Sequence, residues 1–292
     1  MDKKNPGSFI KGVVDAGSKA VTGAINDVGK AATGAVKKVG EIRPTMPQIS
    51  VEDVLRQTLK IPLVRIDRDK FLKKELSKIC TEDVVALAIA RNPAYAGIDR
   101  STMDKIAQQA ITYETNTATA TSFAAGLPGG FAMAATIPAD ITQYFSHILR
   151  VMQKLAYCYG FDNFNLTDEE IDEETLNQIM TFLGVMFGVS GANQGVRALA
   201  EVAAKKVSRS LAQKALTKGT IYPIVKKVAT SVGIRMTKQV FANGVSKAVP
   251  VVGGVVAGGL TLATFLPNCN RLKKSFQELP LCDPGFYDHN DG

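Results

Sequence analysis

The chain has 292 residues, of which 46% are apolar, and it carries a formal net charge of +8. This length is enough for one large domain or two modest ones with a sizeable core. Four widely spaced cysteines and only two histidines exclude a disulfide framework and a zinc site. We therefore expect a reducing cytoplasm, no signal peptide, no metal and no other cofactor.

Residues 1–43 contain an eleven-residue repeat, marked by glycine at positions 12, 23 and 34, that predicts an amphipathic helix. One face carries Val14, Val21, Ile25 and Val28, and the opposite face carries Lys19, Lys30 and Lys37. Because glycines each cost roughly 1 kcal/mol in a helix, we expect this arm to be unfolded in water and helical on a lipid surface. The alternative is a low-complexity linker, or a helix packed on the rest of the chain.

A linker is predicted at residues 44–50, because Pro44 and Pro47 interrupt the repeat there. We expect the main domain at residues 51–276 and an acidic flexible tail at residues 277–292. Ser50 followed by two acids predicts the start of a helix that ends near Lys60.

Amphipathic spacing predicts further helices at residues 69–79, 81–91 and 101–113. Alternation typical of strands is scarce throughout the chain. The predicted fold is therefore all-α, a multi-helix domain that contains glycine-rich apolar helical hairpins.

Three uncharged stretches follow, at residues 115–139, 175–196 and 248–270. Glycines four residues apart, at 126/130, 184/188, 191/195 and 254/258, allow helices to approach closely in a membrane or in a tightly packed soluble protein. Burial inside the domain is our expectation for all three stretches.

The apolar segment 248–266 has basic residues on both sides, and two membrane crossings would need roughly 40 apolar residues. We therefore expect a short hairpin, turning at Gly253–Gly254 or at Gly258–Gly259, which either dips into a membrane or is buried in the domain. The side chains expected to insert in the first case are Val251, Val252, Val255, Val256, Leu260 and Leu262.

The richest polar cluster consists of Asp140, Tyr144, His147 and Lys154, which helical spacing places near one face. In an enzyme, His147 would act as a general base oriented by Asp140 or Tyr144. A hydrogen-bonded polar patch between two helices is the alternative that we favour, because no convincing nucleophile lies nearby in the sequence.

Charge is distributed unevenly, with eleven basic residues and one acid at residues 197–247, directly before the apolar segment. A basic segment that leads into an apolar segment is attracted to an anionic lipid surface. The expected lipid-binding residues of this stretch are Lys205, Lys206, Arg209, Lys214, Lys218, Lys226 and Lys227. Specific nucleic-acid binding is not expected, because no recognition motif accompanies the charge.

Three segments resemble the EcsC family: TSFAAGLPGGFAMAATIPADITQYFSHILRVMQKLAYCYG at 121–160, FLGVMFGVSGAN at 182–193, and the run at 214–265 that contains GTIYPIVKKVATSVGIRMTKQVF. The resemblance extends over roughly residues 77–274 and excludes the repeat arm. It implies a helical domain that, in the namesake, is encoded beside the components of an ABC transporter. The resemblance supplies no established catalytic activity.

These observations lead to the hypothesis of a non-enzymatic protein, peripheral to the cytoplasmic face of a membrane, whose partners are anionic lipid and a transporter or other membrane protein. One alternative is a membrane-proximal hydrolase that uses His147. A second alternative is a pore-forming or membrane-inserting protein.

Overall fold

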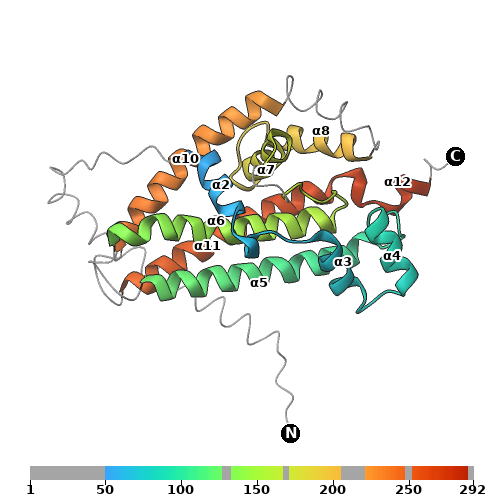
Figure 1. Cartoon of the computed structure of the whole chain (residues 1–292), viewed down its shortest axis with the longest axis horizontal. Coiled ribbons are helices and arrows are strands. Elements are labelled where there is room, and N and C mark those ends of the chain that lie inside the picture. Colours follow the sequence, from blue (N-terminus) through green and yellow to red (C-terminus); the bar gives the residue numbers. More distant parts are fainter. Residues whose placement is uncertain (1–49, 127–132, 167–170, 205–220, 247–251, 289–292) are drawn as a thin grey trace, which may run out of the picture.

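The computed structural model describes residues 50–126, 133–166, 171–204, 221–246 and 252–288, which are coloured in Figure 1. Inside these ranges, the side chains of 123–126, 133–140, 235–246, 252–258 and 260 are outside the description. The described regular structure is entirely helical and contains no strand, which confirms the predicted all-α fold. The repeat arm lies outside the described residues, so its folding on a surface stays a prediction.

The α-helices in chain order are α2 (Val51–Leu59), α3 (Arg68–Leu76), α4 (Glu82–Ala90), α5 (Arg100–Gly126), α6 (Met133–Cys158), α7 (Glu173–Met186), α8 (Ala192–Ala204), α10 (Ile221–Ser246), α11 (Val252–Gln277) and α12 (Pro284–Asp288). Two short 3-10 turns, η1 (Pro62–Val64) and η3 (Pro280–Cys282), accompany them. The Ser50 hydroxyl accepts a hydrogen bond from the Asp53 N–H at 3.3 Å, so the predicted cap of α2 is confirmed.

The helices form two layers (Figure 1). Three of the four longest helices, α5, α6 and α11, run side by side along the longest axis of the molecule. Helices α7, α8 and α10 pack over them, α2 lies against α6, and the α3–α4 pair lies at one end. Inspection of the described helices finds none that is long and apolar enough to cross a membrane.

A cluster of phenylalanines joins the two layers. The rings of Phe161, Phe182 and Phe276 have centroids 4.9–5.1 Å apart, and all three side chains are buried. Phe161 lies three residues after the end of α6, Phe182 in α7 and Phe276 in α11, so this cluster holds together three segments that are distant in sequence. All three residues belong to the hydrophobic core.

Arg68 is a second link between distant segments. Its buried guanidinium donates to the backbone carbonyls of Ala88, Ile89 and Arg91 at 2.7–3.3 Å, and also to that of Phe161 at 3.3 Å. The first three carbonyls belong to the C-terminal end of α4, where helical carbonyls lack partners within the helix. Arg68 therefore caps α4 and fixes it to the segment that follows α6.

The predicted hairpin in the segment 248–266 is wrong. Residues 252–277 form one continuous helix, α11, with no turn at Gly253–Gly254 or at Gly258–Gly259. Glycine weakens a helix by about 1 kcal/mol, but α11 packs along α5 and also contacts α6 and α7. This packing supports the helix through its glycines and through Pro267.

The sequence also misplaced two other boundaries. Helix α5 continues to Gly126, well past the predicted end at residue 113, because its Thr- and Ala-rich second half packs on α11. The described part of the predicted flexible tail is packed on the domain: Leu279, Leu281 and Cys282 are buried, and Asn92 donates to the Tyr287 hydroxyl at 2.7 Å. The acidic composition of this segment suggested flexibility, and the burial of its few apolar residues was not predicted.

Two of the paired glycines allow close helix packing, as predicted, in a helical core. A Cβ at Gly184 would lie 2.6 Å from Cγ2 of Val228, and a Cβ at Gly195 would lie 2.8 Å from Cγ2 of Thr181. Their partners in the pairs serve turns instead, since Gly188 and Gly191 have φ of +67° and +90°. Because Gly184 and Gly195 have no side chain, helices α7, α8 and α10 can approach one another closely at these positions.

This geometry predicts opposite outcomes for two glycine-to-alanine substitutions. Gly184→Ala should lower the free energy of unfolding by about 1–3 kcal/mol, because the added methyl group overlaps Val228 and the Cβ of Ala192. Gly233→Ala in α10 should raise it by up to ~1 kcal/mol, because its methyl group would lie 3.6 Å from the nearest atom, on Val51. Chemical denaturation measures both values, and equal effects of the two changes would contradict the packing described.

Candidate functional site

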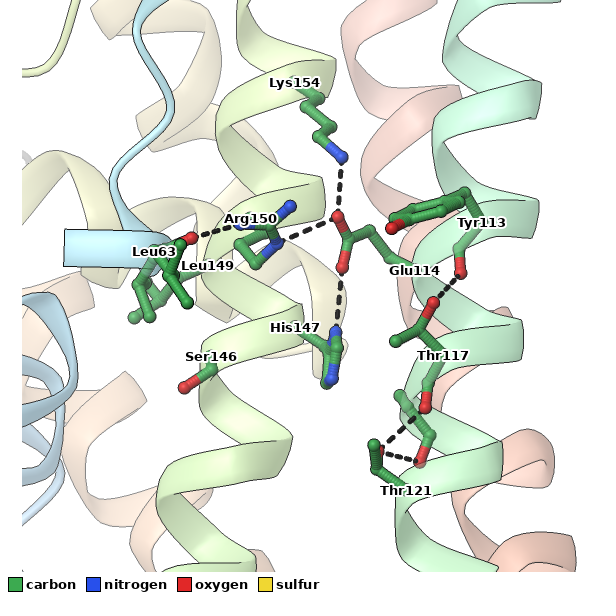
Figure 2. A network of polar contacts seen from close by, with 12 residues as sticks. Leu63, Tyr113, Glu114, Thr117, Thr121, Ser146, His147, Leu149, Arg150 and Lys154 are labelled. Carbon is green, nitrogen blue, oxygen red and sulfur yellow. Dashed lines mark hydrogen bonds and ion pairs between the residues drawn. The ribbon is translucent and has the colours of Figure 1, made fainter. Parts of the chain in front are cut away.

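The most elaborate polar site is built around Glu114 of α5 (Figure 2). Its carboxylate, whose side chain is 0% exposed, contacts three cationic or ionisable side chains of α6. Lys154 Nζ lies 2.6 Å and Arg150 Nε lies 3.0 Å from Oε1, while His147 Nδ1 lies 2.8 Å from Oε2. We call these four residues the Glu114 cluster.

The helical repeat explains why one carboxylate meets three partners. Residues 147, 150 and 154 are spaced by three and four positions, so they occupy one face of α6. That face is turned toward α5, and Glu114 is the only charged residue of the chain between Lys105 and Asp140. The pairing therefore also sets how far α5 and α6 slide along each other.

The pKa of Glu114 results from two opposed effects. Burial raises it, but the hydrogen bond from His147 and the nearby charges of Lys154 and Arg150 outweigh burial. The result is a pKa lowered from 4.5 to about 2. Glu114 is thus an anion at neutral pH, as a buried carboxylate must be if it is to hold two permanent cations.

Two cations of the cluster make further contacts at its edges. Arg150 donates from Nη1 to the backbone carbonyl of Leu63 in η1, which fixes that turn to α6. The Lys154 ammonium lies 5.1 Å from the centroid of the Tyr113 ring. Arg150, His147 and Lys154 are 24%, 13% and 12% exposed, so solvent meets the cations and not the carboxylate.

The hydrogen bond to Glu114 also defines the chemistry of His147. Because the carboxylate can only accept, Nδ1 carries the proton and Nε2 of the neutral ring is left as a base. A carboxylate–histidine pair of this kind forms two parts of a hydrolytic triad. The neighbouring hydroxyls in Figure 2 are used elsewhere, since Ser146 donates to the Thr142 carbonyl and Thr117 donates to the Tyr113 carbonyl. Within the described part of the chain, no hydroxyl or thiol is bonded to Nε2.

The structure brings together two of the four residues that the sequence suggested for catalysis, His147 and Lys154. The predicted orienting role of Tyr144 is wrong. Its hydroxyl is directed toward α11, where Asn268 Nδ2 lies 3.5 Å away, and burial raises the pKa of Tyr144 to about 12. The side chain of Asp140 lies outside the described residues.

Sequence analysis missed Glu114 and Arg150. The sequence could have identified Glu114, because a lone acid within a long uncharged run of a buried helix needs a charged partner. Arg150 could have been identified too, because it lies three residues after His147 and four before Lys154 on the same face.

A second feature is the outward side of α10. Ile221, Val228 and Val232 are buried against the domain, while the opposite side presents Tyr222, Lys226, Lys227 and Ile234. Tyr222 is 61% exposed and Ile234 is 53% exposed. We call these four residues the α10 strip, and α10 contains no acidic residue to offset its charge.

Of the residues predicted to bind lipid, the structure places Lys226 and Lys227 in this exposed strip. Leu262, predicted to insert into a membrane, is partly exposed on α11. The remainder lie outside the described residues or have side chains outside the description: Lys19, Lys30, Lys37, Lys205, Lys206, Arg209, Lys214, Lys218, Val14, Val21, Ile25, Val28, Val251, Val252, Val255, Val256 and Leu260. Their roles stay predictions.

Among the described residues, no group of three or more His, Cys, Asp or Glu side chains is arranged to hold a metal ion. Comparison of the chain with family models, with curated proteins and with solved structures finds no match. The resemblance to the EcsC family therefore stays a prediction.

Removal of the central carboxylate tests the Glu114 cluster. Glu114→Gln should lower the free energy of unfolding at neutral pH by ~3 kcal/mol, because it leaves buried cations unpaired. The folded-state pKa lies below the ordinary value of 4.5, so the carboxylate contributes stability above that pH and loses it as the pH falls toward about 2. The difference between wild type and variant in denaturant titrations should therefore shrink over this acidic range.

Glu278→Gln is the matched control, because Glu278 forms an exposed ion pair with Arg197 at 3.2 Å. It should change stability by less than about 1 kcal/mol at any pH. If the free energies of unfolding of wild type and Glu114→Gln differed by a constant amount down to a pH of about 2, ionised Glu114 would not be the source of this stability.

Proposed function

We propose that this protein binds anionic lipid surfaces peripherally, with the α10 strip as a contact surface. The supporting observation is the composition of the strip: an exposed tyrosine, two lysines and an exposed isoleucine on one side of a helix without acids. Lysines are attracted to anionic headgroups, while tyrosine and isoleucine leave water at the headgroup boundary. Each part of the strip thus matches one part of an anionic membrane surface.

A lipid surface accounts for the strip better than nucleic acid does. Lys226 and Lys227 alone would suit any polyanion. Ile234 has no counterpart on a phosphate backbone, whereas burial of its apolar surface at a membrane is worth about 25 cal/mol per Å². The strip therefore combines attraction with apolar insertion, which is the combination that interfacial helices use.

The sequence extends this proposal beyond the described residues. The basic residues at 205–218 and the repeat arm at 1–43 would add further weak attachments, which combine through effective concentration on one chain. The resemblance to the EcsC family suggests the cytoplasmic face and a transporter or another membrane protein as neighbour.

A membrane-proximal hydrolase is the second candidate, and one contact favours it. The 2.8 Å hydrogen bond from His147 Nδ1 to Glu114 orients a ring nitrogen for proton transfer. With no hydroxyl or thiol bonded to Nε2 in the described part of the chain, water would have to be the nucleophile. His147→Gln would then abolish turnover of an ester substrate and leave vesicle binding intact.

Neutralising the strip tests the lipid proposal. Lys226→Gln combined with Lys227→Gln should reduce the partition of the full chain onto phosphatidylserine-containing vesicles by ~30-fold, since each lysine near an anionic surface contributes about 1 kcal/mol. Co-sedimentation measures the partition. Binding of the wild type should fall steeply with added salt and should be weak on pure phosphatidylcholine.

Lys73→Gln combined with Lys74→Gln provides the control, because it removes the same charge from exposed positions on α3, which lies well away from α10 (Figure 1). This variant should bind nearly as well as the wild type. Equal losses in the two double variants would mean that net charge alone drives binding, and the assignment to α10 would be abandoned.

A further inference from the structure

The place where the repeat arm joins the domain lies beside α10. Val51, the first residue of α2, is buried, and its Cγ2 atom lies 3.6 Å from the position that a Cβ at Gly233 would occupy. Helices α2 and α10 lie side by side in Figure 1. Ser50, which caps α2, is therefore held next to the middle of α10, and the chain enters the domain at this place.

Covalent geometry limits the distance between the arm and the α10 strip. Ser50 follows Arg43, the last residue of the arm, by seven positions. A fully extended chain advances by at most ~3.6 Å per residue, so Arg43 lies within roughly 25 Å of Ser50 in any conformation. Tyr222 and Ile234, at the two ends of the strip, are about 18 Å apart along the helix. The arm and the strip can thus reach the same patch of membrane.

The charges of the two elements indicate what the arm contacts there. Residues 1–43 contain eight basic and four acidic residues, and α10 contains four basic residues and no acid. Like charges repel, so the outward side of α10 is an unfavourable binding site for the arm. An anionic lipid surface attracts both elements, and it also accepts the apolar face of the arm and Tyr222 of the strip.

We propose that the repeat arm and the α10 strip form one composite lipid-binding face, with the arm anchored beside Gly233 and both elements on the same bilayer. This inference rests on the proposed function and adds an orientation to it. In Figure 1, α10 lies at one edge of the molecule and α5 at the opposite edge. The domain therefore binds with α10 against the lipid, while α5, which carries the exposed Tyr113, lies away from the membrane.

Charge removal tests whether the two elements act together. Lys226→Gln with Lys227→Gln, and separately Lys19→Gln with Lys30→Gln, should each weaken the partition of the full chain onto phosphatidylserine-containing vesicles by ~30-fold. The variant with all four changes should lose ~1,000-fold, because the losses of elements that bind simultaneously multiply. If only one element bound at a time, loss of either would weaken the partition by no more than about 2-fold.

Single tryptophans test the orientation, since the chain has none of its own. With brominated phosphatidylserine vesicles, the indole of Ile25→Trp in the arm should be quenched and should emit at shorter wavelength. The indole of Tyr113→Trp on α5 should do neither, and thermal unfolding confirms that this variant folds. The vesicles should also stay dispersed in light scattering, because a protein with both elements on one face does not bridge two vesicles.

Failure of this inference is distinguishable from failure of the lipid proposal. If the arm substitutions change nothing while Lys226→Gln with Lys227→Gln weakens binding, the strip binds lipid without the arm and the composite face is refuted. Vesicle clustering, or quenching of the Tyr113→Trp indole, would overturn the orientation. An Ile25→Trp indole that is already shielded in buffer would show the arm packed on the domain, which also contradicts the composite face. Absence of any binding by the wild type would instead refute the proposed function itself.

Discussion

The buried carboxylate of Glu114 is the interaction on which the arrangement of the long helices depends. A charge with no exposed surface is tolerated only when it is paired, and its partners all lie on one face of α6. A shift of α5 by one helical turn along α6 would separate Glu114 from at least one of them. Packing between apolar helices tolerates such shifts more readily, so we infer that the pairing selects one register.

The remaining helices pack around the pair formed by α5 and α6. Helix α11 packs along α5 and α6, and the ring cluster of Phe161, Phe182 and Phe276 then attaches α7. Helix α10 packs on α7, with Val228 against Gly184 and Ile221 also buried, which leaves Tyr222, Lys226 and Lys227 on the outside. The exposure of the α10 strip is thus a consequence of which side of α10 the core requires.

The sequence predicted those features that depend on nearby residues. Ser50 caps α2 as expected, because a cap is decided within four positions, and helical spacing correctly placed His147 and Lys154 on one face. Their partner could not be identified in this way, since Glu114 lies 33 or more residues away and meets them only after the helices pack. The hairpin predicted at Gly253–Gly254 failed for the same reason: local preference for a turn was outweighed by contacts with α5.

The most direct test of the functional account exploits the absence of tryptophan from the chain. Tyr222→Trp places a single indole fluorophore in the α10 strip, and Leu87→Trp places one at an exposed position on α4 as the control. With phosphatidylserine vesicles, indole emission from the Tyr222→Trp variant should shift to shorter wavelength and be quenched by brominated lipid, while emission from the Leu87→Trp variant should do neither. Protein that sediments with the vesicles while the indole of the Tyr222→Trp variant remains in water would contradict the account.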